Sequence, residues 1–245
     1  SFAIAARRHA DRESGAMSLD RRGFLVMGAA AFAGAAITPG LRLLELVQAR
    51  SPEEAASRLK RWGLLIDTAR CTDCEVCVTA CHTENGVTGH GRPATDAQWI
   101  RKVTLSDKRT GHVQSLPLMC QHCEHPPCVD VCPTGASFKR ADGIVLVDKH
   151  TCIGCRYCVM ACPYGARAFI HEPVTGQNPD VPRGKGTVES CTLCVQRVDR
   201  DETPACVEAC TRDGGKAMVF GDLNDGAGEL HQRLRREPST QLRAD

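Results

Sequence analysis

The apolar residues of this chain form one long run near its start and several short runs farther along. The long run covers residues 23–37, is rich in Ala and Gly, and ends at the residues Thr38, Pro39 and Gly40. With about 15 residues it is shorter than the roughly 20 that a helix needs to cross a bilayer. Its length and weak hydrophobicity fit the apolar region of a signal peptide instead.

The short apolar runs predict short strands. Residues 100–105 and 112–118 are expected to pair as a hairpin, because the segment 106–111 between them is rich in turn-forming residues. The run at 144–147 predicts a further strand, which directly precedes a group of cysteines.

Two segments have the spacing of short amphipathic helices, at residues 50–61 and 230–236. Between the strands and the second helix, residues 171–190 contain several prolines and glycines. This composition predicts an irregular, solvent-exposed loop.

Two arginines, Arg21 and Arg22, stand directly before the long apolar run. Paired arginines, a weakly apolar run and a proline break together resemble a twin-arginine export signal. Small residues near 47–49 would allow cleavage, which makes Arg50 the expected start of the mature protein. The alternative is an Ala-rich core helix with a basic start. We expect residues 1–49 to be an export-signal region and the protein to be periplasmic.

The composition adds one unusual feature. Among 245 residues there are 16 Cys but only six Phe, two Trp and two Tyr, and every cysteine lies between Cys71 and Cys210. Aromatic side chains usually supply much of the burial energy of a core. A segment rich in cysteine and poor in aromatics therefore needs disulfides or bound metal to hold it together.

The net charge of +2 argues against nucleic acid as the main partner, since no stripe of basic residues interleaved with aromatics is visible. Six of the 31 basic and four of the 29 acidic residues lie in residues 1–49. The rest of the chain is therefore neutral, with 25 basic and 25 acidic residues. Bound anionic metal groups would make it negative.

The cysteines form four groups of four, with none left over. The groups are Cys71, Cys74, Cys77 and Cys81; Cys120, Cys123, Cys128 and Cys132; Cys152, Cys155, Cys158 and Cys162; and Cys191, Cys194, Cys206 and Cys210. With Pro163 the third group matches the bacterial ferredoxin run C-x2-C-x2-C-x3-C-P, and the first matches it without the proline. In such a run the fourth cysteine reaches a second cluster, so the runs work in pairs.

Three interpretations of these cysteines are open: disulfides, structural zinc sites and iron–sulfur clusters. Eight disulfides are conceivable in an exported protein, but cysteines two residues apart would close many strained loops. Structural zinc sites use two C-x2-4-C pairs, and zinc does not explain triplets with a distant fourth cysteine. Iron–sulfur clusters account for the whole pattern.

The groups and their neighbours resemble the four-cluster, ferredoxin-like electron-transfer subunits of the dimethyl-sulfoxide-reductase and polysulfide-reductase type. The resemblance rests on the runs at 71–81, 120–128, 152–165 and 191–194, and on Val219-Phe220-Gly221-Asp222-Leu223-Asn224-Asp225. It covers about residues 60–236.

The resemblance implies an α+β fold of two nested ferredoxin-like domains, a tandem 2[4Fe–4S] arrangement with short strands, short helices and long loops. An outer domain would begin within residues 50–119 and be completed within 171–245, after a loop insertion and before a C-terminal helix. An inner domain would occupy residues 120–170.

The resemblance also implies which cysteines share each of four [4Fe–4S] clusters. The implied sets are Cys71, Cys74, Cys77 and Cys210 (set one); Cys81, Cys191, Cys194 and Cys206 (set two); Cys120, Cys123, Cys128 and Cys162 (set three); and Cys132, Cys152, Cys155 and Cys158 (set four). Four thiolates per cluster saturate the irons, so we expect electron transfer and no catalytic residues. No cofactor-binding residues beyond these metal ligands are expected.

The expected function is electron relay between an integral membrane, quinone-interacting subunit of the polysulfide-reductase type and another redox subunit, for which a multihaem cytochrome c is a candidate. No nucleic acid partner and no membrane span after signal cleavage are expected. The alternative is an iron–sulfur subunit that feeds a molybdopterin oxidoreductase of the nitrite, tetrathionate or polysulfide type. A zinc-stapled interaction module is the distant alternative.

Several charged or polar residues lie close to the cysteines. His122 and His125 are expected not to be ligands, because their quartet is already complete. Four arginines could offset cluster charge or serve only as solvated surface, and the sequence does not decide between these roles. They are Arg156, Arg167, Arg197 and Arg212.

Overall fold

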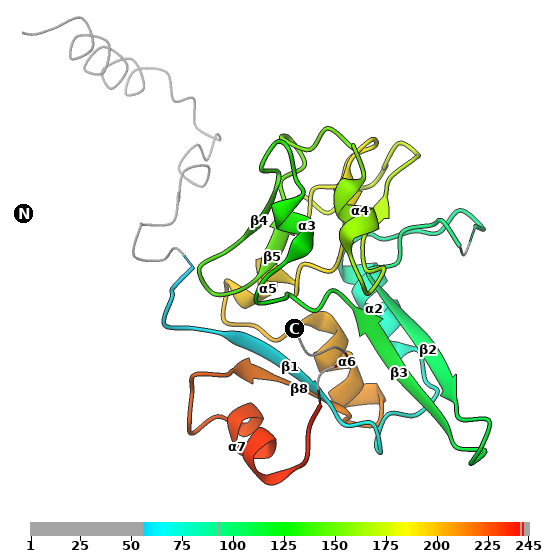
Figure 1. Cartoon of the computed structure of the whole chain (residues 1–245), viewed down its shortest axis with the longest axis vertical. Coiled ribbons are helices and arrows are strands. Elements are labelled where there is room, and N and C mark those ends of the chain that lie inside the picture. Colours follow the sequence, from blue (N-terminus) through cyan, green and yellow to red (C-terminus); the bar gives the residue numbers. More distant parts are fainter. Residues whose placement is uncertain (1–55, 93, 241, 243–245) are drawn as a thin grey trace, which may run out of the picture. The chain divides into compact units, whose positions relative to one another are not determined.

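The computed structural model divides the chain into two units, residues 1–51 and 52–245. It describes residues 56–92, 94–240 and 242, all of which belong to the second unit (Figure 1). The export signal predicted for residues 1–49 therefore lies outside the described residues.

The described residues form short elements joined by long connections. The strands are β1 (Trp62–Ile66), β2 (Ile100–Ser106), β3 (Val113–Met119), β4 (Ser137–Lys139), β5 (Val145–Val147), β6 (Ala168–Phe169), β7 (Val188–Glu189) and β8 (Met218–Asp222). The helices are α2 (Val76–Glu84), α3 (Pro127–Asp130), α4 (Tyr157–Ala161), α5 (Val195–Val198), α6 (Ala205–Asp213) and α7 (Glu229–Arg236). A search of this described part finds no helix with the length and apolar character needed to cross a membrane.

The strands form four separate antiparallel pairs, β1–β8, β2–β3, β4–β5 and β6–β7. The predicted hairpin is confirmed as β2–β3, with Val103 opposite Leu116. The strand predicted at 144–147 is confirmed as β5, and the C-terminal helix predicted at 230–236 is confirmed as α7.

The first and last strands of the described chain lie side by side, although more than 150 residues separate them (Figure 1). The ring of Trp62 on β1 stacks on Phe220 of β8 with centroids 5.1 Å apart. Just beyond the ladder, the Asp67 N–H donates to the Ala217 carbonyl at 2.7 Å. This pairing brings the beginning and the end of the cysteine-rich region together.

Helix α7 covers the β1–β8 ladder at a point where two glycines face each other. Gly63 pairs with Gly221, and the buried Leu230 of α7 lies directly over them. A Cβ on Gly63 would lie 2.8 Å from Leu223 and 3.0 Å from Leu230. The absence of side chains at this pair therefore allows the helix to approach the sheet closely.

The helix predicted for residues 50–61 is wrong in its described part, residues 56–61, which form a turn and extended chain. The backbone here bonds to the far end of the molecule. The Arg61 N–H donates to the Asp222 carboxylate at 2.8 Å, and the Arg61 carbonyl accepts from Leu223 N–H at 2.7 Å. Local helical spacing thus gives way to tertiary hydrogen bonds.

The loop predicted for residues 171–190 is irregular up to its last residues, but the predicted solvent exposure is wrong in part, because Val181 and Arg183 are buried. Val188 and Glu189 form β7 and pair with Phe169 and Ala168 of β6. Glu189 is fully buried and binds the Arg183 guanidinium at 2.6 and 2.8 Å, so a salt bridge within this segment orders its end.

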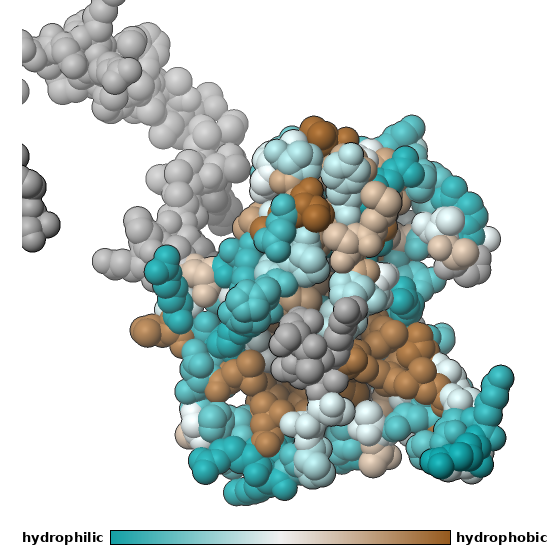
Figure 2. Space-filling model, viewed as in Figure 1, coloured by the Kyte–Doolittle hydropathy of each residue, from teal (hydrophilic) through white to brown (hydrophobic). Residues whose placement is uncertain are grey.

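Cysteines make up a large share of the buried residues. One core cluster combines Trp99, Ile100 and Met218 with five cysteines from α2, α6 and their neighbourhood. A second combines Val145 and Val188 with Cys128 and Cys158. Figure 2 shows apolar residues at the surface near α3, β4 and α4. Ile153 and Met160 are among the large apolar side chains that are exposed.

Replacing Gly63 by Ala should destabilise the unit by about 1–3 kcal/mol, because the new methyl group would overlap Leu223 and Leu230. The measurement is the thermal unfolding midpoint of the anaerobic, cluster-loaded protein. Gly226→Ala is the matched control, since a Cβ there meets nothing within 4 Å. Equal midpoints for the two variants would contradict this packing.

Candidate functional site

The loops between paired cysteines share a backbone conformation. In three of the four groups, the residue before the second cysteine is left-handed: His122 (φ 43°), Gly154 (φ 70°) and Leu193 (φ 56°). At Gly154 a Cβ would lie 2.2 Å from the Gly186 carbonyl oxygen, so only glycine fits there. The left-handed residue turns each short loop back on itself.

Two helices carry cysteines four residues apart. Cys77 and Cys81 lie on α2, and Cys206 and Cys210 lie on α6, and all four are buried. Residues at this spacing share one helix face. Because α2 and α6 pack against each other, they bring thiols from the first and fourth groups together.

The structure places the cysteines of set one together at one end of α2. Burial raises the pKa of the Cys77 thiol to about 11, against the opposing charge of Lys102. The thiolates of Cys210, Cys74 and Cys71 raise it further. Lys102 also reaches Cys71, with its Nζ 3.3 Å from the Sγ atom.

The cysteines of set two meet between α2, α5 and α6. Burial raises the pKa of the Cys81 thiol, and nearby Cys206 and Cys194 raise it further. Burial also raises the pKa of Cys191, where Cys81 and Cys206 add to the shift. The pKa of Cys206 rises to about 12, again mainly through burial.

In set three, Cys120, Cys128 and Cys162 lie together. Burial raises the pKa of the Cys120 thiol to about 12, and the thiolates of Cys128 and Cys162 add to the shift. Cys123 ends the short loop that begins at Cys120. The charge of Arg167 opposes the rise for both Cys120 and Cys128.

The four cysteines of set four line one small pocket together: Cys132, Cys152, Cys155 and Cys158. Burial acts to raise the pKa of Cys132, but hydrogen bonds from Ser137 and Thr134 lower it overall. Cys155 is exposed, whereas the other fifteen cysteines are buried or half-buried.

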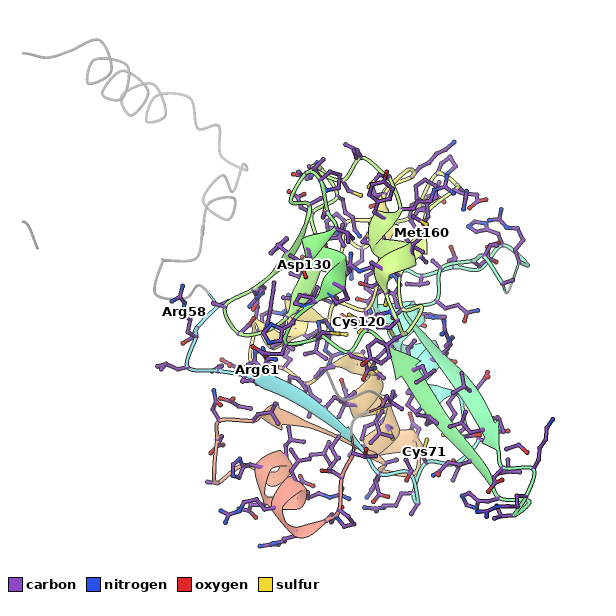
Figure 3. All side chains as sticks on the ribbon, viewed as in Figure 1. Arg58, Arg61, Cys71, Cys120, Asp130 and Met160 are labelled. Atoms are coloured by element: carbon purple, nitrogen blue, oxygen red, sulfur yellow. The ribbon has the colours of Figure 1, made fainter. Side chains whose placement is uncertain are left out.

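Electrostatic contacts between the sets place them in a linear order. The negative charge of Cys77, in set one, raises the pKa of Cys81 in set two. The charge of Cys120, in set three, raises the pKa of Cys191 in set two. The charge of Cys158, in set four, raises the pKa of Cys128 in set three. In the view of Figure 3, Cys120 lies between Cys71 and Met160, which is on the helix α4 that carries Cys158 of set four.

Each set receives at least one hydrogen bond to sulfur from this chain. The backbone donors are Ser137 to Cys132 (3.4 Å), Ala166 to Cys162 (3.4 Å), Leu193 to Cys191 (3.4 Å) and Ala217 to Cys210 (3.3 Å). Three of these donors lie at or just before a short strand, β4, β6 or β8. The strands therefore aim N–H groups at the thiolates, and such bonds tune cluster potentials.

Asn85 contacts two of the cysteines, and the sequence did not predict this role. It caps α2, is almost completely buried, and donates through Nδ2 to the Cys81 carbonyl at 2.8 Å. The same nitrogen lies 3.6 Å from Cys81 Sγ and 3.8 Å from Cys194 Sγ. The only signal in the sequence is its place four residues after the last cysteine of the first group.

His122 uses one ring nitrogen to hold the fold. Its Nδ1 accepts the Val145 N–H at 2.9 Å, which places the proton of the neutral ring on Nε2. Burial lowers its pKa to about 4, and the charges of Arg167 and Arg61 add to the shift. The buried Nε2 has no hydrogen-bond partner among the described residues.

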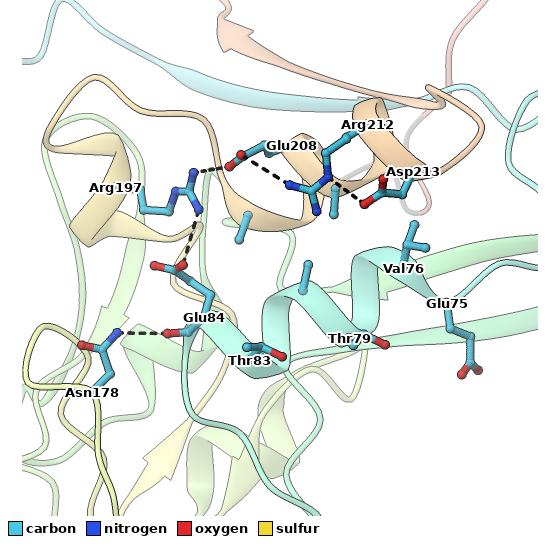
Figure 4. Close-up of a pocket in the computed structure, with 13 residues that line it drawn as sticks. Glu75, Val76, Thr79, Thr83, Glu84, Asn178, Arg197, Glu208, Arg212 and Asp213 are labelled. Atoms are coloured by element: carbon cyan, nitrogen blue, oxygen red, sulfur yellow. Dashed lines mark hydrogen bonds and ion pairs between the residues drawn. The ribbon is translucent and has the colours of Figure 1, made fainter.

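The four arginines near the cysteines differ in their surroundings. Arg197 bridges Glu84 and Glu208 in the groove between α2 and α6, where Arg212 pairs with Asp213 (Figure 4). Arg156 lies over the Phe169 ring, 4.1 Å from its centroid. Arg167 alone among the four is buried.

The residues present fit four [4Fe–4S] clusters. All sixteen cysteines are free thiols, grouped with hydrogen-bond donors at sulfur. No three His, Cys, Asp or Glu side chains in the described ranges converge to hold a single metal ion. Which cysteines ligate which cluster stays a prediction.

Two protein-family models match the chain, and both describe a 4Fe-4S dicluster domain. One matches residues 70–136 and the other residues 111–223. Two dicluster domains correspond to four [4Fe–4S] clusters, which agrees with the sixteen cysteines. These matches favour iron–sulfur clusters over the disulfide and zinc interpretations.

Curated relatives match most of the chain. The iron–sulfur subunit 1 of an Hdr-like menaquinol oxidoreductase from Archaeoglobus fulgidus is 43% identical, over 93% of this chain and 94% of the relative. One tetrathionate reductase subunit, from Salmonella typhimurium, is 39% identical, over 77% of this chain and 70% of the relative. The NrfC protein of Escherichia coli is 39% identical, over 73% of each chain.

Replacing Asn85 by Leu keeps the branched shape and the number of heavy atoms in the side chain but removes the donor that faces Cys81 and Cys194. The reduction potential of the set-two cluster should fall, because a hydrogen bond to a thiolate stabilises the reduced, more negative state. Redox titration followed by electron paramagnetic resonance measures the shift. Asn224→Ala is the control, since that side chain binds the Leu59 carbonyl instead. Four unchanged potentials in the Asn85 variant would contradict the assignment.

Proposed function

This chain belongs to the family of ferredoxin-like iron–sulfur electron-transfer subunits of oxidoreductases, and from that membership we propose a specific role for it. It relays electrons between a quinone-interacting membrane subunit and a second redox subunit of a respiratory or sulfur-metabolism complex. The two ferredoxin-like domains are nested, with the inner one at residues 120–170.

The linear order of the four cysteine sets carries this proposal. A relay needs a continuous series of redox centres, and contacts connect set one to two, two to three and three to four. Each bound cluster supplies one-electron transfer. The protein chain positions the thiols, buries them and directs N–H donors to sulfur.

The two ends of the series have different environments. At one end, Lys102 contacts Cys71. At the other, Cys155 is exposed and two exposed apolar side chains, Ile153 and Met160, lie near it in sequence. Electrons can be exchanged with a partner most directly where a ligand reaches the surface, so we propose the Cys155 end as one point of exchange.

A quinone-linked role is favoured over a molybdopterin-linked one by the extent of the matches. The relative that matches over 93% of this chain is named as a menaquinol oxidoreductase subunit, whereas the tetrathionate reductase subunit matches over 77%. A finer resemblance is to the periplasmic O subunit of the sulfite-reductase-associated Dsr membrane complex. A multihaem cytochrome c is the second partner that this type of complex would supply.

Purification of the native complex through a tag on this chain tests the proposal. The complex should contain an integral membrane subunit, and this chain should hold about sixteen irons. Menaquinol should bleach the visible absorption of the intact complex under anaerobic conditions. The chain separated from its partners is the control and should stay oxidised with menaquinol but bleach with dithionite. A molybdopterin subunit in the complex, with no response to menaquinol, would support the alternative.

We further propose that the protein is exported to the periplasm by the twin-arginine route. The paired Arg21 and Arg22 before the apolar run support this location. Loading of clusters before export would suit a route known for carrying folded proteins.

Replacing both Arg21 and Arg22 by Lys should keep the protein in the cytoplasm, because the route reads the arginine pair. Cell fractionation with immunoblotting measures the distribution. The chain offers a matched control in Arg7 and Arg8, a second arginine pair that does not adjoin the apolar run. Periplasmic protein at the normal level in the Arg21/Arg22 variant would refute export by this route.

A further inference from the structure

Arg167 is a buried cation that forms no salt bridge or side-chain hydrogen bond within the described chain. The residue is 5% exposed and lies between Cys162 and strand β6. Its three guanidinium nitrogens, Nε, Nη1 and Nη2, are buried and have no hydrogen-bond partner among the described residues. A guanidinium group normally satisfies several of its five donors when it is buried.

The buried carboxylates of the described chain are already engaged elsewhere. Asp142 binds Arg140, with the closest oxygen 2.8 Å from its Nη2. Glu189 binds Arg183 through both oxygens. Arg167 is thus the one buried arginine in the described residues that forms no salt bridge with a carboxylate.

Arg167 lies close to the thiols of set three. The residue before it, Ala166, donates its N–H to the Cys162 Sγ atom at 3.4 Å. The positive charge of Arg167 also acts on the Cys120 and Cys128 thiols. The charge of Arg167 also lowers the pKa of His122. The buried Nε2–H of His122 likewise has no hydrogen-bond partner in the described part of the chain. Two unsatisfied cationic or donor groups therefore lie beside the same cysteines.

An isolated buried charge is strongly unfavourable unless an opposite charge lies close to it. A [4Fe–4S] cluster with four thiolate ligands carries a net negative charge, delocalised over many sulfur atoms. Such an anion would accept the guanidinium donors and offset the cost of burying them. The cluster becomes more negative by one charge on reduction, so a fixed nearby cation favours the reduced state.

We propose that Arg167 is the buried counter-charge of the cluster held by Cys120, Cys123, Cys128 and Cys162, and that it raises the reduction potential of this cluster. The residue is a positioning and tuning residue, because it bears on the cluster and on no substrate. The proposal rests on the predicted ligand set but not on the identity of the redox partners. It assigns to Arg167 a role that Arg156, Arg197 and Arg212 do not share, since each of those has its own partner in the protein.

Two substitutions separate charge from shape. Arg167→Met removes the charge but keeps a long flexible side chain, and Arg167→Lys keeps the charge. Arg109→Met is the matched control, because Arg109 is an exposed arginine in the turn between β2 and β3. Iron and sulfide content and an anaerobic redox titration, followed by electron paramagnetic resonance, are measured on each full-length, cluster-loaded protein.

In Arg167→Met, one of the four midpoint potentials should fall while the other three stay near their original values. Arg167→Lys should keep that potential close to the original, and Arg109→Met should change none. Four unchanged potentials in Arg167→Met, with all clusters present, would overturn the proposal. An equal fall in Arg167→Met and Arg167→Lys would also overturn it, because the shape of the side chain would then matter and its charge would not.

The iron and sulfide content tests the case in which an Arg167 variant does not bind the set-three cluster. Loss of about a quarter of the iron in Arg167→Met, with full iron in Arg167→Lys, supports the counter-charge role. Loss of the same cluster in both variants contradicts it. An unsubstituted protein with fewer than four clusters would overturn the ligand assignment itself, and this result is distinguishable because it appears before any substitution is made.

Discussion

The spacing of four residues between cysteines on a helix is the constraint on which this structure depends. Cys77 and Cys81 share one face of α2, and Cys206 and Cys210 share one face of α6. In the predicted ligand assignment the two thiols on each helix belong to different sets, so each helix would connect two adjacent redox centres. The packing of α2 against α6 then joins the first cysteine group to the fourth.

Burial of so many thiols has an electrostatic cost that shapes the rest of the core. Low polarity around the thiols raises their pKa values, and each set needs donors or cations to favour the thiolate form. The chain supplies backbone N–H groups at strand starts, Asn85 at set two, Lys102 at set one and Arg167 at set three. The polar interior is organised around sulfur, which explains how a core with few aromatic residues can be stable once clusters are bound.

Some of these features could be predicted because they depend on local spacing. The cysteine groups, the β2–β3 hairpin and α7 all follow from residues close together in the sequence. Other features could not be predicted in this way. The segment 56–61 has helical spacing but forms hydrogen bonds with Asp222 and Leu223. The local sequence does not show that these distant residues will supply hydrogen-bond partners. The role of Asn85 depends on a thiol more than a hundred residues away.

The sequence by itself determined the chemistry of this protein: sixteen cysteines in ferredoxin-like spacing, enough for four clusters, because ligand type and local spacing are written directly into the chain. Only the tertiary structure decided how those cysteines combine across the chain and which charges lie beside them. Four arginines near cysteines look equivalent in sequence. Burial and salt bridges distinguish them, since a charge matters to a redox centre only where neither water nor a carboxylate neutralises it.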